Sequence, residues 1–141
     1  MSANRDTWPD LAGRLQQTEA GRRHVLPVRV YFEDTDFSGL VYHASYVRWC
    51  ERGRSDFLRL IGNDHAALMQ GGDGREAAAF VVRRMQLEYL KPARIDEILE
   101  VVTRVHELGA ATLVLDQRIS RDGVPLFEAQ RSEERRVGKE C

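Results

Sequence analysis

The chain has 141 residues, of which 43% are hydrophobic, so it is long enough for one globular domain with a substantial core. Its 21 basic and 22 acidic residues give a formal net charge of -1 and form no long block of one sign, which argues against a nucleic-acid-binding surface or a polybasic membrane anchor. No apolar run approaches the roughly 18 residues of a membrane-spanning helix, and the N-terminus lacks a secretory pattern, so we expect a cytoplasmic protein.

The N-terminal part of the sequence divides into a polar segment and a strand. Residues 1–24 are polar and have almost no periodicity, which predicts a weakly ordered extension with at most one short helix. From Val25 onward apolar and polar residues alternate, and Phe32 is the last apolar member of the alternation. This pattern predicts a half-buried strand that ends near Asp34.

A long amphipathic helix is predicted from about Ala44 to Ile61, because the apolar residues shift to helical spacing. Gly53 weakens the helix, which indicates that the helix approaches another backbone closely at this point. Cys50 is expected to be a buried free thiol, since the two cysteines of the chain have no metal-ligand or disulfide spacing. A second short helix over 64–69 and a flexible glycine loop over 71–74 are expected to follow.

Strands dominate the second half of the sequence. Three strand-like runs cover 78–89, 98–106 and 111–120, and a fourth begins at Val124. The connections are short, which predicts antiparallel hairpins rather than crossovers. We therefore predict an α+β domain over 25–130, in which one antiparallel sheet wraps around one helix and a partner subunit covers part of the remaining apolar surface.

The last eleven residues, 131–141, have neither strand nor helix periodicity. They look like the in-frame translation of a common sequencing adapter, so we expect them to be a non-native tail. On this interpretation the last strand, which begins at Val124, is truncated.

A candidate catalytic site lies between the first strand and the long helix. A carboxylate at such a junction faces the unpaired amides of the helix start, so a carbonyl held between them meets a base or nucleophile on one side and hydrogen-bond donors on the other. The candidates are one of the acids Asp34 and Asp36 together with His43, with Gly39 and Tyr42 beside them. Ordinary turn and cap residues have the same composition, and the spacing does not decide whether Asp34 and Asp36 share a face.

Two enzyme classes are disfavoured by the motifs that the sequence lacks. No serine stands in a Gly-x-Ser-x-Gly setting, which argues against a serine hydrolase. The glycines of 71–74 are not followed by Lys-Ser or Lys-Thr, which argues against a phosphate-binding loop.

The stretches 28–46, 50–54 and 80–94 closely resemble the hotdog-fold acyl-CoA thioesterases of the 4-hydroxybenzoyl-CoA thioesterase group. The bacterial branch associated with the Tol-Pal cell-envelope system is the most similar. The resemblance covers about residues 25–130. It implies a helix wrapped by an antiparallel sheet, dimers or tetramers with active sites at the subunit interface, and hydrolysis of acyl-CoA thioesters without a metal or a cofactor.

The resemblance also implies roles for single residues. The essential carboxylate of the family corresponds to Asp36, the motif histidine corresponds to His43, and the amide of His43 would bind the thioester oxygen. Phe32 departs from the pattern, because the most similar proteins often carry tyrosine there, so a hydroxyl role is excluded at this position.

We therefore expect an Asp36-dependent thioesterase acting on short- to medium-chain or hydroxylated acyl-CoA, with Asp36 as general base or nucleophile. Coenzyme A carries phosphates, so basic residues are needed near the site. Candidates for this contact are Arg83, Arg84, Lys91 and Arg94. Two alternatives remain: an acyl-carrier-protein thioesterase, and a non-catalytic CoA-ester-binding partner of an envelope complex. A peripheral association with envelope or lipid-synthesis proteins is also consistent with the resemblance.

Overall fold

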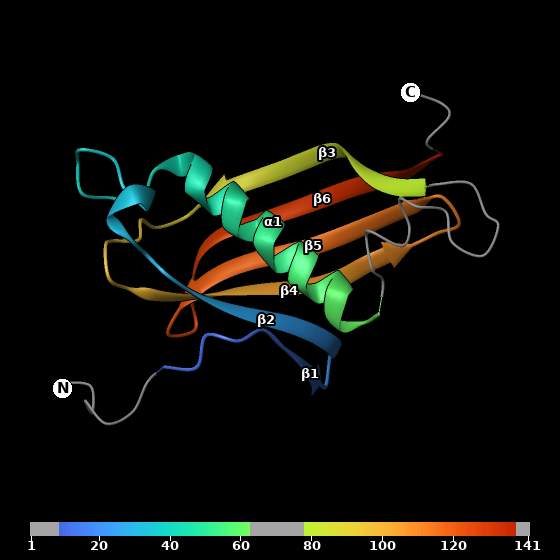
Figure 1. Ribbon diagram of the computed structural model, residues 1–141, viewed down its shortest axis with the longest axis horizontal. Helices are drawn as coiled ribbons and strands as arrows, with labels where there is room; N and C mark the ends of the chain where they lie inside the picture. Colours follow the sequence, from blue (N-terminus) through green and yellow to red (C-terminus); the bar gives the residue numbers. More distant parts are fainter. Residues whose placement is uncertain (1–8, 63–77, 138–141) are drawn as a thin grey trace.

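The computed structural model describes residues 9–62 and 78–137, which form six strands and one long helix (Figure 1). The strands are β1 (Arg14–Thr18), β2 (Gly21–Arg29), β3 (Ala78–Tyr89), β4 (Ile98–Leu108), β5 (Thr112–Arg121) and β6 (Val124–Val137). A short 3-10 helix, η1 (Phe32–Asp34), precedes the long helix α1 (His43–Leu60). No helix within the described ranges is long and apolar enough to cross a bilayer.

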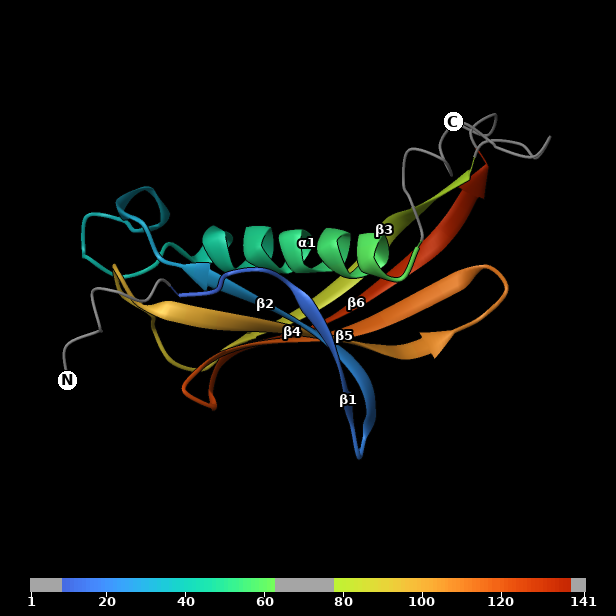
Figure 2. The same cartoon turned by 60° about the horizontal axis from the view of Figure 1, so that its bottom comes forward.

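The six strands form one antiparallel sheet in the order β1-β2-β4-β5-β6-β3. The sheet is curved, and α1 lies across its concave face (Figures 1 and 2). This arrangement confirms the predicted α+β architecture of one sheet wrapped around one helix. The other face of the sheet is exposed. Along β4 and β5 the exposed side chains of this face alternate with the buried ones that point toward the helix.

The core lies between α1 and the strands. The inward positions of β4 and β5 alternate with outward ones, so Leu99, Val101 and Ile119 are fully buried beneath the helix. Gly53 faces Val101, and a Cβ atom at Gly53 would lie only 2.9 Å from the Cγ1 atom of that valine. The close approach to a sheet strand is therefore confirmed, but the nearest atoms belong to side chains of β4 rather than to its backbone. The other buried residues of the core cluster include Tyr46, Trp49, Leu126, Phe127 and Ala129.

Cys50 is a buried free thiol, as the sequence predicted. Burial raises the pKa of this thiol to about 12, so the sulfur stays protonated at neutral pH. It serves as a small apolar residue of the core.

The prediction for the N-terminal segment is wrong where the structure describes it. Instead of an extension with one helix, Arg14–Thr18 forms β1 and Gly21–Arg29 forms β2. Gly21 has a φ of 109°, which permits the tight turn between them, and Thr18 Oγ1 donates a hydrogen bond to the Gly21 carbonyl. Strand β1 pairs with one edge of β2, and β4 pairs with the other edge.

The prediction of sequential hairpins is correct for β4, β5 and β6 and wrong for β3. Strand β3 pairs with β6 at the far edge of the sheet, and β4 pairs with β2. The segment that joins β3 to β4 is held instead by the loop before α1, because the Val41 amide bonds the Ala93 carbonyl and the Asp96 amide bonds the Val30 carbonyl. Long-range pairing of this kind leaves no local signal in the sequence.

Strand β6 continues through residues 131–137, a segment for which the sequence indicated no strand. Its inward side changes from apolar residues to Arg131 and Glu133, which are buried as an ion pair. A non-native origin of this segment stays a prediction, and the change of side-chain character at Arg131 is consistent with it. The helix expected over 64–69 and the loop over 71–74 lie outside the described residues.

Candidate active site

The loop between β2 and α1 is organised by Asp34. Strand β2 ends at Arg29, and the chain turns because the Asp34 carboxylate accepts a hydrogen bond from the Tyr31 amide at 2.9 Å. The predicted strand up to Asp34 is therefore wrong, and Phe32 is 80% exposed rather than half-buried. Asp34 itself is only 5% exposed, so it is a structural residue of the loop.

Asp36 has a different environment. Its Oδ1 accepts hydrogen bonds from the Ser38 amide at 2.8 Å and from the Ser38 hydroxyl, while its Oδ2 accepts none from the residues that the structure describes. The Ser38 hydroxyl, the Ser38 amide and the nearby His43 ring hold the pKa of Asp36 below its usual range, with only a small opposing effect of burial. Asp36 is therefore ionised at neutral pH and keeps one oxygen available for a substrate or for water.

Helix α1 begins at His43, which lines the same hollow as Asp36. The Ser45 amide bonds the Tyr42 carbonyl at 2.9 Å. Within the described ranges, no group accepts a hydrogen bond from the amides of His43 and Ala44. Such orphan donors at the positive end of the helix dipole are suited to stabilise a developing oxyanion.

A hollow of about 340 Å³ lies between the carboxylate and the helix start, and we call it the Asp36 hollow. Its wall combines the polar groups of Asp36, Ser38 and His43 with mostly apolar surface. The other lining residues are Leu40, Val41, Tyr46, Tyr89, Leu90, Lys91 and Pro92. The combination of a few polar groups with an apolar wall is typical of a small-molecule site.

The structure assigns different places to the other residues predicted for the oxyanion site. Gly39 has a φ of 85°, and its amide donates to the Asp36 carbonyl at 3.1 Å, so it shapes the turn that presents Asp36. The Tyr42 ring lies 4.4 Å from the His43 ring, centroid to centroid, and its amide donates to the Asp34 carbonyl. The hydroxyl of Tyr42 has no partner among the described residues.

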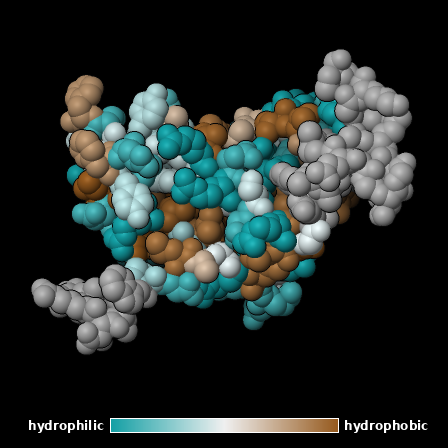
Figure 3. Space-filling view, viewed as in Figure 1, coloured by the Kyte–Doolittle hydropathy of each residue, from teal (hydrophilic) through white to brown (hydrophobic). Residues whose placement is uncertain are grey.

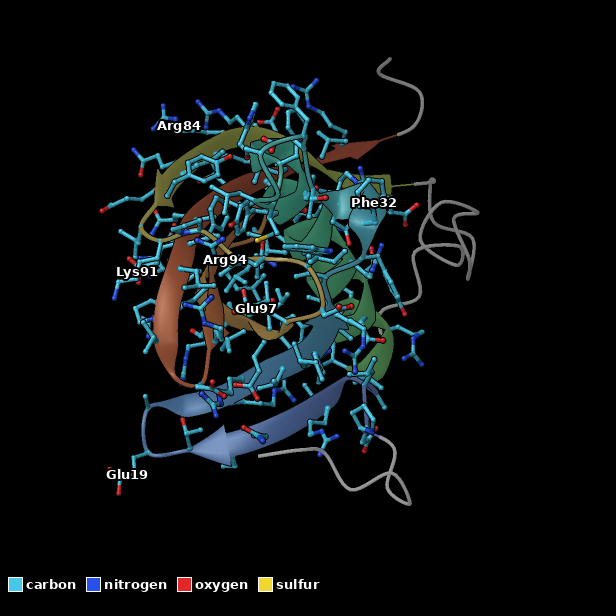
Figure 4. All side chains as sticks on the ribbon, turned by 90° about the vertical axis from the view of Figure 1, so that its left-hand side faces the viewer. Glu19, Phe32, Arg84, Lys91, Arg94 and Glu97 are labelled. Carbon is cyan, nitrogen blue, oxygen red and sulfur yellow. The ribbon has the colours of Figure 1, made fainter. Side chains whose placement is uncertain are left out.

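Three of the four basic residues expected to contact coenzyme A, Arg84, Lys91 and Arg94, do not gather at one point (Figure 4). Of these four, Lys91 lines the Asp36 hollow. Arg83 and Arg84 are exposed on β3, and Arg94 is exposed in the segment before β4. Among the residues that the structure describes, no three potential ligands gather as they would around a metal ion.

Sequence reasoning did not identify two residues of the site. Ser38 follows Asp36 by two positions, a spacing that often produces a side-chain-to-backbone turn, so a local signal for it existed. Tyr89 donates a hydrogen bond from its hydroxyl to the His43 carbonyl at 2.9 Å across 46 positions of the chain. Only the tertiary structure reveals this second contact.

Hydrophobic side chains protrude from the end of the molecule that carries the loop before α1 (Figure 3). Phe32 and Phe37 are the most exposed of the large hydrophobic residues that the structure describes. Phe37 directly follows Asp36 in the chain, so an apolar surface adjoins the carboxylate.

Comparison with known proteins agrees with this geometry. The family model described as the thioesterase superfamily matches residues 38–127. The acyl-CoA thioester hydrolase YbgC of Escherichia coli O6:H1 is 50% identical over 93 residues, which are 66% of this chain and 66% of that protein. The acyl-CoA thioesterase YbgC of Haemophilus influenzae is 39% identical over 103 residues, which are 73% of each chain. The chain thus spans about two thirds of the length of these relatives.

A solved structure shows the same fold. The crystal structure of a probable thioesterase from Bartonella henselae is 39% identical, superposes with a TM-score of 0.78, and covers 83% of this chain and 94% of that chain. The hotdog fold that the resemblance implied is thereby confirmed. Because the family model spans more than half of the sequence, and the sheet and the helix agree with the fold of the solved thioesterase, the chain belongs to the thioesterase superfamily.

Proposed function

We propose that the chain hydrolyses acyl-CoA thioesters at the Asp36 hollow, releasing coenzyme A and a carboxylic acid. One observation carries the proposal: an ionised carboxylate with a free oxygen and His43, the first residue of a helix, line one hollow with a mostly apolar wall. The family membership and the YbgC relatives, which are named acyl-CoA hydrolases, support the same activity.

Asp36 has two possible roles in this reaction. As a general base, it takes a proton from water while the water oxygen attacks the thioester carbonyl. As a nucleophile, its free oxygen attacks the carbonyl and forms a mixed anhydride, which water then hydrolyses. In both cases the carbonyl oxygen becomes negative, the amides of His43 and Ala44 stabilise it, and the carbon–sulfur bond breaks with release of the CoA thiolate.

Replacing Asp36 with asparagine tests the proposal, because the amide keeps the shape of the side chain and removes its charge. We expect the release of CoA from a panel of acyl-CoA esters to fall at least about a hundredfold. Glu33→Gln is the matched control, since Glu33 is exposed in the same loop and has no partner among the described residues. Undiminished turnover in Asp36→Asn would overturn the assignment.

Solvent oxygen found on Asp36 after a single turnover in heavy-oxygen water identifies Asp36 as the nucleophile. A nucleophilic carboxylate acquires a solvent oxygen when the anhydride is hydrolysed by attack on the Asp36 carbonyl carbon, and peptide mass spectrometry detects the label. A general base leaves Asp36 unlabelled and sends the solvent oxygen directly to the acid product.

Lys91 is the strongest candidate for contact with the phosphates of coenzyme A, because it is the basic residue that lines the hollow within the described part of the chain. An ammonium group provides a point charge for a phosphate. Lys91→Ala should raise KM for acyl-CoA and leave kcat nearly unchanged. Arg84→Ala, on the exposed edge strand, is the corresponding test of the sequence-based assignment.

A second copy of the chain is the expected partner of β3. This twelve-residue strand pairs with β6 on one side and has no strand on its other side among the described residues. Its exposed large hydrophobic residues are Val81, Val82, Leu87 and Tyr89. A long edge strand with exposed apolar side chains favours pairing with another strand.

Such a second copy would also close the site. Asp36 is exposed in the single chain, whereas thioester hydrolysis benefits from a site with restricted access to water. Analytical ultracentrifugation of the wild type and of Val81→Pro tests the pairing, because proline removes a strand donor and the variant should sediment as a smaller species. A monomeric wild type would contradict the proposal.

The acyl-carrier-protein thioesterase alternative has one observation in its favour. Arg48 and Arg52 lie on the exposed face of α1 and make no ion pair with the residues that the structure describes, so they are available to an acidic carrier protein. Comparing hydrolysis of the same acyl group on coenzyme A and on a carrier protein discriminates the alternatives. The cytoplasmic location and the association with an envelope system stay predictions.

A further inference from the structure

The start of α1 is held from two sides. On the loop side, the carbonyl of the buried Asp34 accepts hydrogen bonds from the Tyr42 amide at 2.8 Å and from the Ser45 hydroxyl at 3.0 Å. On the sheet side, the Tyr89 hydroxyl donates to the His43 carbonyl at 2.9 Å. A carbonyl oxygen has two lone pairs, so His43 can accept this bond in addition to the one within the helix.

The Tyr89 ring is fixed by its neighbours. Its centroid lies 4.9 Å from that of Phe127 and 5.6 Å from that of Tyr46, with both pairs in edge-to-face geometry. The His43 ring lies 6.5 Å away at an interplanar angle of 83°. Because these contacts restrict the ring, the hydroxyl has little freedom to leave the His43 carbonyl.

The protonation state of Tyr89 suits this contact. Burial raises the pKa of the phenol above its usual value, and the nearby Cys50 acts in the same direction. The hydroxyl therefore keeps its proton throughout the neutral range and remains a donor.

The geometry points to Tyr89 as a positioning residue of thioester hydrolysis, which holds the first turn of α1 so that His43 and its amide stay at the Asp36 hollow. This inference rests on the proposed function. Tyr89 lies on β3, whereas the amides belong to α1, so the edge strand and the oxyanion-binding turn are mechanically connected. A misdirected oxyanion donor weakens transition-state stabilisation more than it weakens substrate binding.

The test replaces Tyr89 with phenylalanine, which keeps the ring contacts and removes only the hydroxyl. We expect kcat for acyl-CoA hydrolysis to fall about five- to tenfold, the size of effect expected from one neutral hydrogen bond. KM should stay within about twofold, because the wall of the hollow keeps its shape. Tyr31→Phe is the control, since Tyr31 is exposed and its hydroxyl has no partner among the described residues.

A second measurement separates positioning from other roles. The Ser45 amide, bonded to the Tyr42 carbonyl at 2.9 Å in the same turn, should exchange its hydrogen faster in Tyr89→Phe than in the wild type or in Tyr31→Phe. The inference is overturned if kcat does not change, if KM rises as much as kcat falls, or if kcat falls while exchange at Ser45 stays the same.

The failure of this inference is distinguishable from the failure of the proposed function. If the wild type releases no CoA from any ester of the panel, the proposed function fails and Tyr89 has no hydrolysis to support. If the wild type is active and Tyr89→Phe matches it, the proposed function stands and only the role of Tyr89 is wrong.

Discussion

The two ends of α1 are held against the sheet by different kinds of contact. At the N-terminal end, beside the Asp36 hollow, Tyr46 stacks on Phe127 with ring centroids 5.2 Å apart, and Trp49 packs edge-on against Tyr46. The Tyr46 hydroxyl accepts a hydrogen bond from the Ala93 amide at 3.0 Å, so the one polar atom of this ring is satisfied. The start of the helix is therefore held against the sheet by contacts between aromatic rings.

At the C-terminal end, charged and polar side chains occupy the same interface. Arg54 binds the buried carboxylate of Glu133 with two of its nitrogens, and Arg131 joins the same carboxylate. Two residues later, Asp56 accepts a hydrogen bond from the buried His24 ring at 2.7 Å. The helix end therefore combines paired polar groups with a second apolar cluster, in which Phe57 packs on Leu113 and Leu115.

The difference matters because the two kinds of interface tolerate change differently. Apolar packing is non-directional, so a ring replaced by another apolar side chain loses only part of its contribution. A buried ion pair depends on both partners, because the loss of one leaves the other charged and without compensation. The catalytic end thus has the more tolerant support, while the stability of the far end depends on individual charges.

The largest expected loss of stability comes from removing a charge from the ion pairs at the C-terminal end of α1. Glu133→Ala removes the buried carboxylate that Arg54 and Arg131 share, although both arginines keep the half-exposed Glu51 nearby. We expect the free energy of unfolding to fall by about 3 kcal/mol, the lower end of the range for breaking a buried pair. Urea denaturation measures the change. Glu134→Ala is the control, because the neighbouring Glu134 pairs with Arg136 near the surface and should cost at most about 1 kcal/mol. Equal losses in the two variants would contradict the contrast between the ends.

A smaller effect is expected from the apolar end. Phe127→Leu keeps an apolar side chain but removes the stacked contact with Tyr46 and the edge contact with Tyr89. We expect the free energy of unfolding to fall by about 1–2 kcal/mol, less than the loss at the charged end. The same denaturation experiment checks the value. A loss as large as that of Glu133→Ala would show that the aromatic contacts tolerate substitution no better than the ion pair does.

The smallest effect on stability, but a diagnostic one on activity, is expected from Ser38→Ala. The Ser38 hydroxyl is the main cause of the lowered pKa of Asp36, so its removal moves that pKa back toward the ordinary value. Hydrolysis requires the ionised carboxylate and is lost as the pH falls through this pKa. The acid limb of the kcat/KM profile should therefore move to higher pH, with little change at pH 7 or above.

Ser55→Ala, on the exposed face of α1, is the control for this profile. Its acid limb should coincide with that of the wild type. An acid limb that stays in place in Ser38→Ala would mean that Asp36 is not the group that limits activity at low pH.

The helix and most strands were predictable because their signals are local. The spacing of Tyr46, Cys50 and Phe57 predicted a helix that the structure places within one residue of the expected limits at either end. Strand β3 has the predicted bounds, and Gly53 correctly indicated the close approach to β4. The turn ahead of the helix indicated a candidate carboxylate but did not separate Asp34 from Asp36, and the choice of Asp36 came from the family resemblance.

The sequence by itself therefore determined the α+β class, the long helix and the loop that presents Asp36, since each follows from residues within a few positions of one another. Only the tertiary structure decided that β3 pairs with β6, that Tyr89 reaches His43, and that Asp34 is buried while Asp36 is exposed. The first two features are contacts between residues far apart in the chain, which leave no periodic signal in the sequence. The third depends on which of two similar carboxylates the fold buries, and the local sequence does not show this.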